Sequence, residues 1–353
     1  MTVKNKNLRS EKDILSSWNN VKNIIVSIVC TAYNHEDYIE SALFGFLMQE
    51  TDFAFEILIN DDASKDKTPA ILLHYQDLYP QIVKPILQSE NQYSQGIKPM
   101  QSLYKKAKGK YIALCEGDDY WNDKHKLQKQ VAVFTENKKI SLCFHPAIEL
   151  DHVANRENIM CQHYPNSGPV KTADVILGRG PFMPTASLMF INQDIETLTK
   201  SYESAPIGDY FVQIFMSSLG EAYYLNDVMS VYRRNAVGSW TTTSHKQLTD
   251  QISHKQSMIT AIDKFSYFLA NDKHNKHLKK IMLFYAIDSL KITKGLSDFF
   301  FALKQLTKVS NDLSIYNRHI LLTQAFFGGI IKKATQLTKK IIKKVLKHES
   351  PSS

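Results

Sequence analysis

Short apolar runs alternate with segments of helical periodicity between residues 23 and 147. The first run, Ile24 to Thr31 (IIVSIVCT), is continuous and rich in β-branched residues, which is typical of a strand buried on both faces. Further runs follow at 55–59, 83–88, 111–115 and 140–145, and the expected helices between them lie at 37–48, 68–79, 100–108 and 124–137, with Thr68 as the N-cap of the second helix. This alternation predicts a Rossmann-like, mostly parallel α/β sheet with helices on both faces.

The chain of 353 residues has room for one large domain or two modest ones. A hydrophobic share of 43% is enough to form a buried core. We expect an N-terminal extension (1–22), the α/β half (23–147), a mixed second half of the same domain (148–245), a helical C-terminal region (246–330) and a basic tail (331–353).

The cysteines and the N-terminal segment bear on the cellular compartment of the protein. The four cysteines, Cys30, Cys115, Cys143 and Cys161, are too dispersed for a disulfide framework. The N-terminal segment has no apolar stretch of the secretory type, and no window of about 18 uninterrupted apolar residues occurs. We therefore expect a cytoplasmic protein.

The net charge of +8 is concentrated at the C-terminus. From Lys332 onward there are seven lysines and a single acid, Glu349, so the rest of the chain carries only +2. We therefore expect no nucleic-acid partner. Within 331–347, apolar residues recur at helical spacing opposite the lysines, which predicts an amphipathic helix that binds an anionic membrane surface. The alternative is a solvated helix that packs on its own domain.

Polar and acidic residues follow three of the expected strands. The segments are Thr31 to Asn34 (TAYN), Asn60 to Asp62 (NDD) and Glu116 to Asp119 (EGDD). Ligands of parallel α/β sheets bind outside the carboxyl ends of the strands, so these segments should line one site. The chain contains neither G-x-G-x-x-G nor G-x-x-x-x-G-K-[ST], which excludes the usual glycine-rich phosphate cradles.

Carboxylates repel phosphate unless a divalent cation lies between them. In Glu116-Gly117-Asp118, two carboxylates flank a glycine that permits close approach, and Asp119 adds a third. Mg²⁺ or Mn²⁺ would take carboxylate oxygens on one side and phosphate oxygens on the other. The alternative is that Asp118 and Asp119 only cap the following helix.

Three stretches together resemble the family 2 glycosyltransferases of the GT-A fold. They are VSIVCTAYNHEDYIESALFGFLMQ, FEILINDDASKDKT and KGKYIALCEGDDYW, in the family's order and spacing over residues 26–135. A weaker similarity continues through PTASLMF (184–190), IGDYFVQIFMSSLG (207–220) and DVMSVYRRNAVGSW (227–240). The resemblance implies an inverting bacterial enzyme that uses a nucleotide-activated sugar.

Two segments correspond to the family's nucleotide-base site. Thr31, Ala32 and Tyr33 match the loop that holds the base, with Tyr33 stacking on it. Asp62 matches the acid that hydrogen-bonds the base imide, and the resemblance leaves Asp61 either to contact the base or to hold the loop.

The resemblance also assigns the diphosphate end of the donor. Glu116, Gly117 and Asp118 occupy the family's D-x-D position, where Asp118 binds the metal with Asp119 beside it. Glutamate replaces the usual first aspartate, and its side chain is one methylene longer. Asn91 falls where the family has an Asn-x-Gly segment near the nucleotide.

Catalytic and closing residues follow in the second half. Asp209, before an apolar helix expected at 211–219, matches the family's general base, and Glu203 is the fallback. The other interpretation of Asp209 is a helix N-cap. Arg233 and Arg234 match a segment that closes over the diphosphate, although Asn235 replaces the family's histidine there.

The resulting hypothesis is a metal-dependent hexosyl- or N-acetylhexosaminyltransferase. The resemblance implies a UDP-sugar as the donor. The enzyme would move the sugar to a hydroxyl of a glycan or lipid-linked oligosaccharide in surface polysaccharide biosynthesis. One rival is a nucleotidyltransferase, which would need a glycine-rich basic loop that the segment from Tyr33 to Glu36 does not provide. Another is a non-catalytic, membrane-associated nucleotide-sugar-binding protein, against which Asp62, Asp118 and Asp209 argue together.

Overall fold

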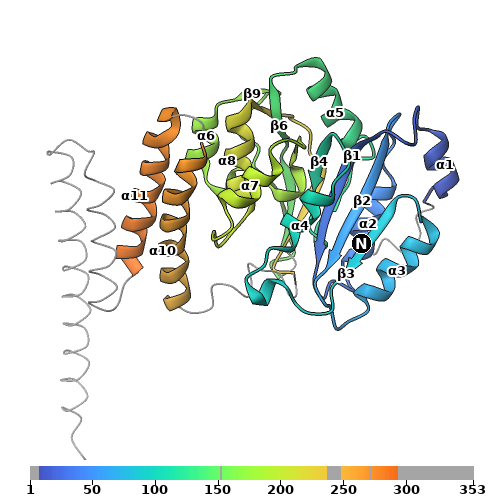
Figure 1. The fold of residues 1–353 in the computed structure, drawn as a ribbon, viewed down its shortest axis with the longest axis horizontal. Coiled ribbons are helices and arrows are strands. Elements are labelled where there is room, and N and C mark those ends of the chain that lie inside the picture. Colours follow the sequence, from blue (N-terminus) through green and yellow to red (C-terminus); the bar gives the residue numbers. More distant parts are fainter. Residues whose placement is uncertain (1–7, 152, 237–247, 270–271, 293–353) are drawn as a thin grey trace, which may run out of the picture. The chain divides into compact units, whose positions relative to one another are not determined.

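The computed structural model describes residues 8–151, 153–236, 248–269 and 272–292 (Figure 1). The chain divides into two compact units. The first comprises Met1–Lys246 with Tyr267–His274, and the second comprises Gln247–Ser266 with Asn275–Ser353.

The N-terminal part of the first unit alternates strands and helices as the sequence predicts. Its elements are α1 (Glu11–Ser16), β1 (Ile24–Ala32), α2 (Ile39–Leu47), β2 (Ala54–Asp61), α3 (Thr68–Leu78), β3 (Val83–Leu87), the 3₁₀ turn η1 (Tyr93–Gln95), α4 (Pro99–Lys106), β4 (Tyr111–Leu114), β5 (Tyr120–Trp121), α5 (Lys126–Glu136) and β6 (Ile140–Phe144). All strands and helices expected between 23 and 147 are confirmed, with ends that differ by a few residues.

The remainder of the first unit mixes short strands, turns and helices. Its elements are β7 (Ala147–Asp151), β8 (Arg156–Met160), β9 (Gly168–Val170), α6 (Thr172–Gly178), η2 (Gly180–Phe182), η3 (Thr185–Ser187), β10 (Met189–Ile191), α7 (Ile195–Ser201), α8 (Asp209–Leu219), β11 (Glu221–Tyr224) and β12 (Ser230–Arg234). The helix expected at 211–219 is confirmed and begins two residues earlier.

Eight strands form the main sheet, in the order β3-β2-β1-β4-β10-β6-β11-β9. Figure 1 shows β3, β2, β1 and β4 side by side, and these four are mutually parallel. β10 is antiparallel to both of its neighbours, β4 and β6, whereas β6 and β11 are parallel and β9 is antiparallel to β11. The mostly parallel sheet is thus confirmed, and a strand from the second half of the unit separates β4 from β6.

The core of the first unit lies between the sheet and the helices packed on it. β1 and β2 are buried along most of their length, as their β-branched composition predicts. At Gly45 in α2, an added Cβ would lie 2.7 Å from the carbonyl oxygen of Trp121, so only glycine lets this helix approach β5 so closely. The approach positions the chain directly after the segment from Glu116 to Asp119.

A smaller sheet, with the order β5-β12-β7-β8, lies beside the end of β4. β12 is antiparallel to β5 and parallel to β7, and β7 forms an antiparallel pair with β8. Because β5 follows the acidic segment directly, this sheet joins that segment to β12.

The start of α3 differs from the expectation. Lys67 occupies the N-cap position without a side-chain cap, and Thr68 is the first helical residue. The carboxylate of Asp66 accepts the N–H of Thr68 (2.9 Å), so the Thr68 hydroxyl is left to accept the N–H of His35 (2.9 Å). Thr68 therefore links two loops instead of capping its helix.

The described part of the second unit consists of α10 (Leu248–Phe265) and α11 (Asn275–Ile292). An ion pair between Lys255 and Asp288 (2.5 Å) joins the two helices. Among the described helices, none has the length and apolar character needed to cross a membrane. The tail expected to bind a membrane, 331–347, lies outside the described residues.

Candidate functional site

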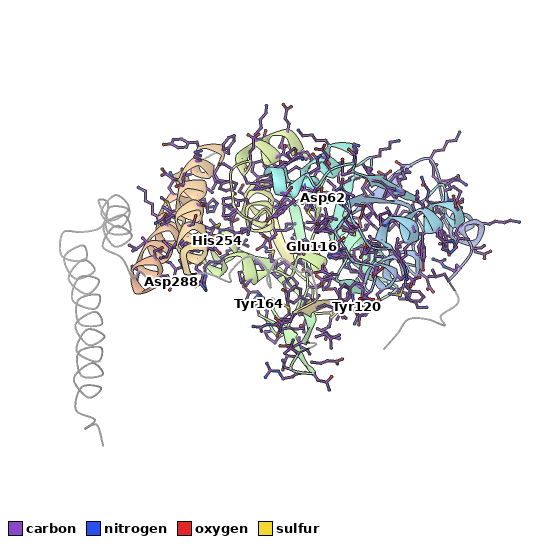
Figure 2. The ribbon with its side chains drawn as sticks, turned by 90° about the horizontal axis from the view of Figure 1, so that it is seen from below. Asp62, Glu116, Tyr120, Tyr164, His254 and Asp288 are labelled. Carbon is purple, nitrogen blue, oxygen red and sulfur yellow. The ribbon has the colours of Figure 1, made fainter. Side chains whose placement is uncertain are left out.

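The loops that follow β1, β2 and β4 meet at one edge of the main sheet. β1 pairs in parallel with both β2 and β4, so the carboxyl ends of all three strands point the same way. Asp62 follows β2 and Glu116 follows β4, and both residues are labelled in Figure 2. The three segments singled out in the sequence are therefore brought to one edge, as the fold rule predicts.

The segment Glu116–Asp119, which we call the acidic turn, gathers three carboxyl groups. One oxygen from each of Glu116, Asp118 and Asp119 lies within 4.8 Å of the others. The turn is tied to β1 by the N–H of Gly117, which donates to the carbonyl of Thr31 (2.9 Å). Oxygen donors at this spacing fit a hard divalent cation such as Mg²⁺ or Mn²⁺.

Gly117 is required by close packing in the acidic turn. A Cβ added there would lie 2.8 Å from Nδ1 of His35, 3.0 Å from Cδ1 of Ile39 and 3.1 Å from the carbonyl oxygen of Thr31. His35 is buried, and its Nδ1 has no hydrogen-bond partner among the described residues. Sequence reasoning did not single out His35; its position directly after the Thr31–Asn34 segment was the available signal.

The acidic turn is electrostatically strained. Burial, together with the charges of Asp118 and Asp209, raises the pKa of Glu116 to about 8. Burial and the charges of Asp118 and Glu116 raise the pKa of Asp119 well above its ordinary value, while Arg233 opposes the rise. Ionised carboxylates this close repel one another. Protonation or a bound metal cation relieves this repulsion, so the acidic turn favours one or the other.

Arg233 contacts the acidic turn instead of facing away from it. Its backbone N–H donates to Oδ1 of Asp119 (2.8 Å), and its Nη1 donates to the carbonyl oxygen of Asp118 (2.6 Å). The guanidinium lies between two rings, with its Cζ 4.4 Å from the ring centre of Tyr120 and 5.3 Å from that of Tyr38. The two tyrosines were not identified from the sequence.

The neighbours of Arg233 make different contacts. Arg234 is exposed and pairs with Glu149 (3.1 Å), and the side chain of Asn235 donates to Asp151 (3.1 Å). Contact of Arg233 or Arg234 with a diphosphate stays a prediction.

The loop after β1 offers an exposed aromatic ring. Thr31 and Ala32 end the strand, and Tyr33 beyond them is 41% exposed. Asn34 adopts a left-handed backbone conformation (φ 55°), and its N–H donates to the hydroxyl of Ser64 in the neighbouring loop (2.8 Å). The exposed Tyr33 ring is available for stacking.

Asp61 and Asp62 organise the loops around them. The carboxylate of Asp61 accepts both the N–H and the hydroxyl of Ser64, and burial raises its pKa. The carboxylate of Asp62 accepts the N–H groups of Gln92 (2.7 Å) and Tyr93 (3.0 Å). Asn91 donates to the carbonyl of Asp62 (3.2 Å), so the structure brings these two predicted residues together.

Asp209 lies at the start of α8, and its charge contributes to the raised pKa of Glu116. The N-cap position belongs to Gly208, so Asp209 is the first helical residue and not the cap. Its carboxylate accepts the N–H of Tyr210 (2.8 Å) and the hydroxyl of Thr185 (3.4 Å). Burial raises the pKa of Asp209, and these two hydrogen bonds oppose the rise.

The loop before Asp209 is held by a lysine. Nζ of Lys98 donates to the carbonyls of Tyr202 and Ala205, and burial lowers its pKa to about 8. Glu203, the fallback base, is exposed in this loop. Asp209 is therefore the better placed of the two carboxylates relative to the acidic turn.

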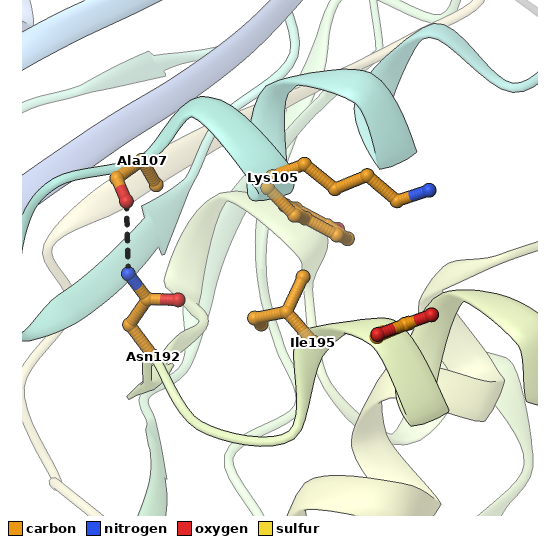
Figure 3. Close-up of a pocket in the computed structure, with 6 residues that line it drawn as sticks. Lys105, Ala107, Asn192 and Ile195 are labelled. Carbon is orange, nitrogen blue, oxygen red and sulfur yellow. Dashed lines mark hydrogen bonds between the residues drawn. The ribbon is translucent and has the colours of Figure 1, made fainter.

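A surface hollow of about 320 Å³ lies elsewhere, between α4 and α7 (Figure 3). Tyr104, Lys105, Asn192 and Glu196 are among its lining residues, and Asn192 donates to the carbonyl of Ala107 (3.0 Å). None of the predicted site residues lines this hollow. We therefore place the candidate site at the edge of the main sheet and not in this hollow.

The fold and the position of the acidic turn define a class, the GT-A glycosyltransferase scaffold. S. aureus TarS residues 1–349, solved in complex with UDP-GlcNAc, superposes on this chain with a TM-score of 0.63 and 17% sequence identity, over 87% of this chain and 88% of that one. Residues 27–197 match the family described as glycosyl transferase family 2. This part of the chain, residues 27–197, is a family 2 glycosyltransferase domain.

Two relatives illustrate how the sequence is shared. An uncharacterized protein of Mycobacterium tuberculosis is 36% identical over 233 residues, which are 64% of this chain and 62% of the relative. The chain thus matches less than two thirds of that relative's length. The Escherichia coli UDP-Glc:alpha-D-GlcNAc-diphosphoundecaprenol beta-1,3-glucosyltransferase WfaP is 35% identical over 117 residues, which are 33% of this chain and 43% of WfaP.

Proposed function

We propose that this chain is an inverting, metal-dependent glycosyltransferase that moves a sugar from a uridine-diphosphate sugar to a hydroxyl of a glycan or lipid-linked oligosaccharide. One observation carries the proposal: three carboxyl oxygens lie within 4.8 Å of one another after β4, and the charge of Asp209 contributes to the raised pKa of Glu116 among them. A cation site beside a buried carboxylate is what a displacement at a diphosphate-activated sugar requires.

The donor's base would bind in the loops after β1 and β2. The exposed ring of Tyr33 supplies a stacking surface, next to the chain ends Thr31 and Ala32. Asp62 and Asn91 fix the backbone at residues 91–93, which would form the opposite wall. We favour uridine as the base because TarS was solved with UDP-GlcNAc and WfaP is named for transfer from UDP-Glc.

The acidic turn would hold Mg²⁺ or Mn²⁺. Asp118 would be the principal ligand, because one oxygen of Asp119 already accepts the N–H of Arg233. Glu116 and the second oxygen of Asp119 would complete the protein's share of the ligands. When bound, the cation supplies positive charge that stabilises the departing diphosphate.

Asp209 would act as the general base. Its carboxylate accepts the proton of the acceptor hydroxyl as that oxygen bonds to the anomeric carbon, and the bond from this carbon to the diphosphate oxygen breaks on the opposite face. The configuration inverts, and the proton stays on Asp209 until solvent removes it. Thr185 orients the carboxylate, and burial makes it a stronger base than an exposed aspartate.

Membrane apposition would suit a lipid-linked acceptor. Residues 331–347 alternate lysines with apolar residues at helical spacing, which is the pattern of an interfacial helix. We include an anionic membrane surface among the partners on this sequence pattern alone.

Donor binding can be tested by titrating UDP-GlcNAc, UDP-Glc and GDP-mannose into the full chain, with Mn²⁺ or with EDTA. We expect a UDP-sugar to bind in Mn²⁺ and to lose at least about tenfold in affinity in EDTA. Asp118→Asn should abolish this metal dependence, whereas the control Asp77→Asn, on the exposed face of α3, should keep it. Metal-dependent binding that survives Asp118→Asn would disprove the assignment of the acidic turn.

The base is tested separately by Asp209→Asn. Transfer should fall by about 10²–10⁴-fold, because the amide cannot take the acceptor's proton, while donor affinity stays near the wild-type value. Loss of donor affinity in this variant would instead assign Asp209 a structural role.

A further inference from the structure

The strand β12 brings a buried arginine to the acidic turn. In its antiparallel pairing with β5, Ser230 lies opposite Trp121 and Val231 lies opposite Tyr120. The same register, continued past the end of β5, places Arg233 beside Asp118. The two hydrogen bonds from Arg233 to Asp118 and Asp119 therefore follow from strand pairing.

We infer that Arg233 is a positioning residue that holds the acidic turn in its cation-binding shape, and that it is not a ligand of the diphosphate. The inference rests on the proposed function, because it assumes that the acidic turn binds a divalent cation. We call Arg233 with the rings of Tyr38 and Tyr120 the arginine clamp.

The acidic turn needs such a restraint. Glu116, Asp118 and Asp119 repel one another when ionised, and a free turn would separate them. The N–H of Arg233 fixes one oxygen of Asp119 (2.8 Å), and Nη1 fixes the Asp118 carbonyl (2.6 Å), so both neighbouring residues are held by one arginine. One carboxylate oxygen of Asp119 and the main chain at Asp118 are therefore held in place without the cation.

The surroundings of Arg233 argue against direct phosphate binding. The residue is only 7% exposed, and its guanidinium is covered by the ring of Tyr120 at 4.4 Å and by that of Tyr38 at 5.3 Å. A buried guanidinium is stabilised by such rings and by its carbonyl partner, and it would lose both on turning outward. Arg234, by contrast, is exposed on the same strand.

The two roles predict opposite signs for cation affinity. Arg233→Gln removes a positive charge next to three acids, so electrostatics alone would tighten binding of Mn²⁺. The substitution keeps the backbone N–H that binds Asp119 and removes the Nη1 contact to the Asp118 carbonyl. If that contact sets the geometry of the turn, the same substitution weakens Mn²⁺ binding, because the main chain at Asp118 is no longer fixed. Loss of a supporting contact of this kind typically costs about 10–100-fold in metal affinity.

The experiment titrates the full chain with Mn²⁺ alone and counts free Mn²⁺ by electron paramagnetic resonance. We expect Arg233→Gln to bind Mn²⁺ at least about tenfold more weakly than the wild type. The control Arg156→Gln, which removes the same charge from an exposed position in β8, should bind as the wild type does. UDP affinity measured in EDTA should be unchanged in Arg233→Gln.

The rings supply a second, milder test that does not remove the arginine. Tyr120→Ala should weaken Mn²⁺ binding, whereas Tyr120→Phe keeps the ring and should retain it. If thermal unfolding shows that Arg233→Gln is not folded, the Mn²⁺ affinities of Tyr120→Ala and Tyr120→Phe test the inference instead.

Two results would overturn the inference. The first is that Arg233→Gln and Tyr120→Ala bind Mn²⁺ as tightly as the wild type or more tightly. The second is that Arg233→Gln loses affinity for UDP in EDTA, which would show that Arg233 contacts the diphosphate. A wild-type chain that binds no Mn²⁺ would refute the proposed function, and the clamp with it.

Discussion

Lys126 offers a quantitative test of how the core beneath the acidic turn is built. The residue is fully buried at the start of α5, where Nζ donates to Oε1 of Gln130 (2.6 Å) and lies 4.1 Å from the ring centre of Trp121. Burial lowers its pKa from 10.5 to about 7, although Cys115, Cys143 and Asp123 oppose the fall. We predict that Lys126→Met changes the pH dependence of stability.

The magnitude follows from the difference between the folded and unfolded pKa values of Lys126. A fall from 10.5 to about 7 corresponds, at about 1.36 kcal/mol per pH unit, to a penalty of about 5 kcal/mol for the charged form. The penalty is fully present below about pH 7. Between about pH 7 and 10.5 the unfolded state keeps a proton that the folded state has released, so the free energy of unfolding rises with pH.

Urea unfolding followed by tryptophan fluorescence measures this rise. From pH 6 to pH 9, the wild type should gain about 2.5 kcal/mol relative to Lys126→Met, because methionine does not titrate. The difference between the two profiles removes the contributions of Glu116 and Lys98, whose pKa values also lie near 8. Lys138→Met, at an exposed lysine after α5, is the control and should keep the wild-type slope. Parallel profiles for the wild type and Lys126→Met would refute the reasoning.

Three further predictions concern the site and the tail. Gly117→Ala should weaken Mn²⁺ binding, because the added Cβ would lie 2.8 Å from Nδ1 of His35. The control Gly168→Ala has open space around its Cβ and should bind Mn²⁺ as the wild type does. Equal Mn²⁺ affinities in the two variants would contradict the packing argument. Because burial raises the pKa of Asp209, kcat should fall with decreasing pH at a pH above the ordinary aspartate range, and a rate that is flat down to pH 4 would argue against this base. Deleting residues 331–353 should reduce sedimentation with anionic liposomes in a salt-sensitive way, and unchanged sedimentation would favour a solvated tail.

The strands and helices of the N-terminal half were predictable because each carries its own periodic signal. The run from Ile24 to Thr31 has enough β-branched residues to mark a doubly buried strand, and Thr68-Pro69 marks a helix start within one residue. Parallel pairing then places the acidic segments at one edge without any knowledge of side-chain contacts.

The remaining features depend on contacts between distant residues. β10 has three residues and β5 has two, so neither is long enough to show an alternating pattern. The contacts of the Arg233 side chain depend on the pairing of β12 with β5, which lies more than a hundred residues earlier in the chain. The local motif Tyr-Arg-Arg-Asn carries no information about that pairing. Arg233 is buried in the structure, and its contact with a diphosphate stays a prediction of the motif.

The insertion of β10 has a consequence for synthesis of the chain. Its residues Met189–Ile191 lie between β4 and β6, so a nascent polypeptide that ends before them exposes unpaired edges on both strands. Cotranslational folding of the main sheet must therefore wait for this late segment to leave the ribosome. A fragment cut near residue 150 is consequently expected to aggregate more readily than a chain that includes β10.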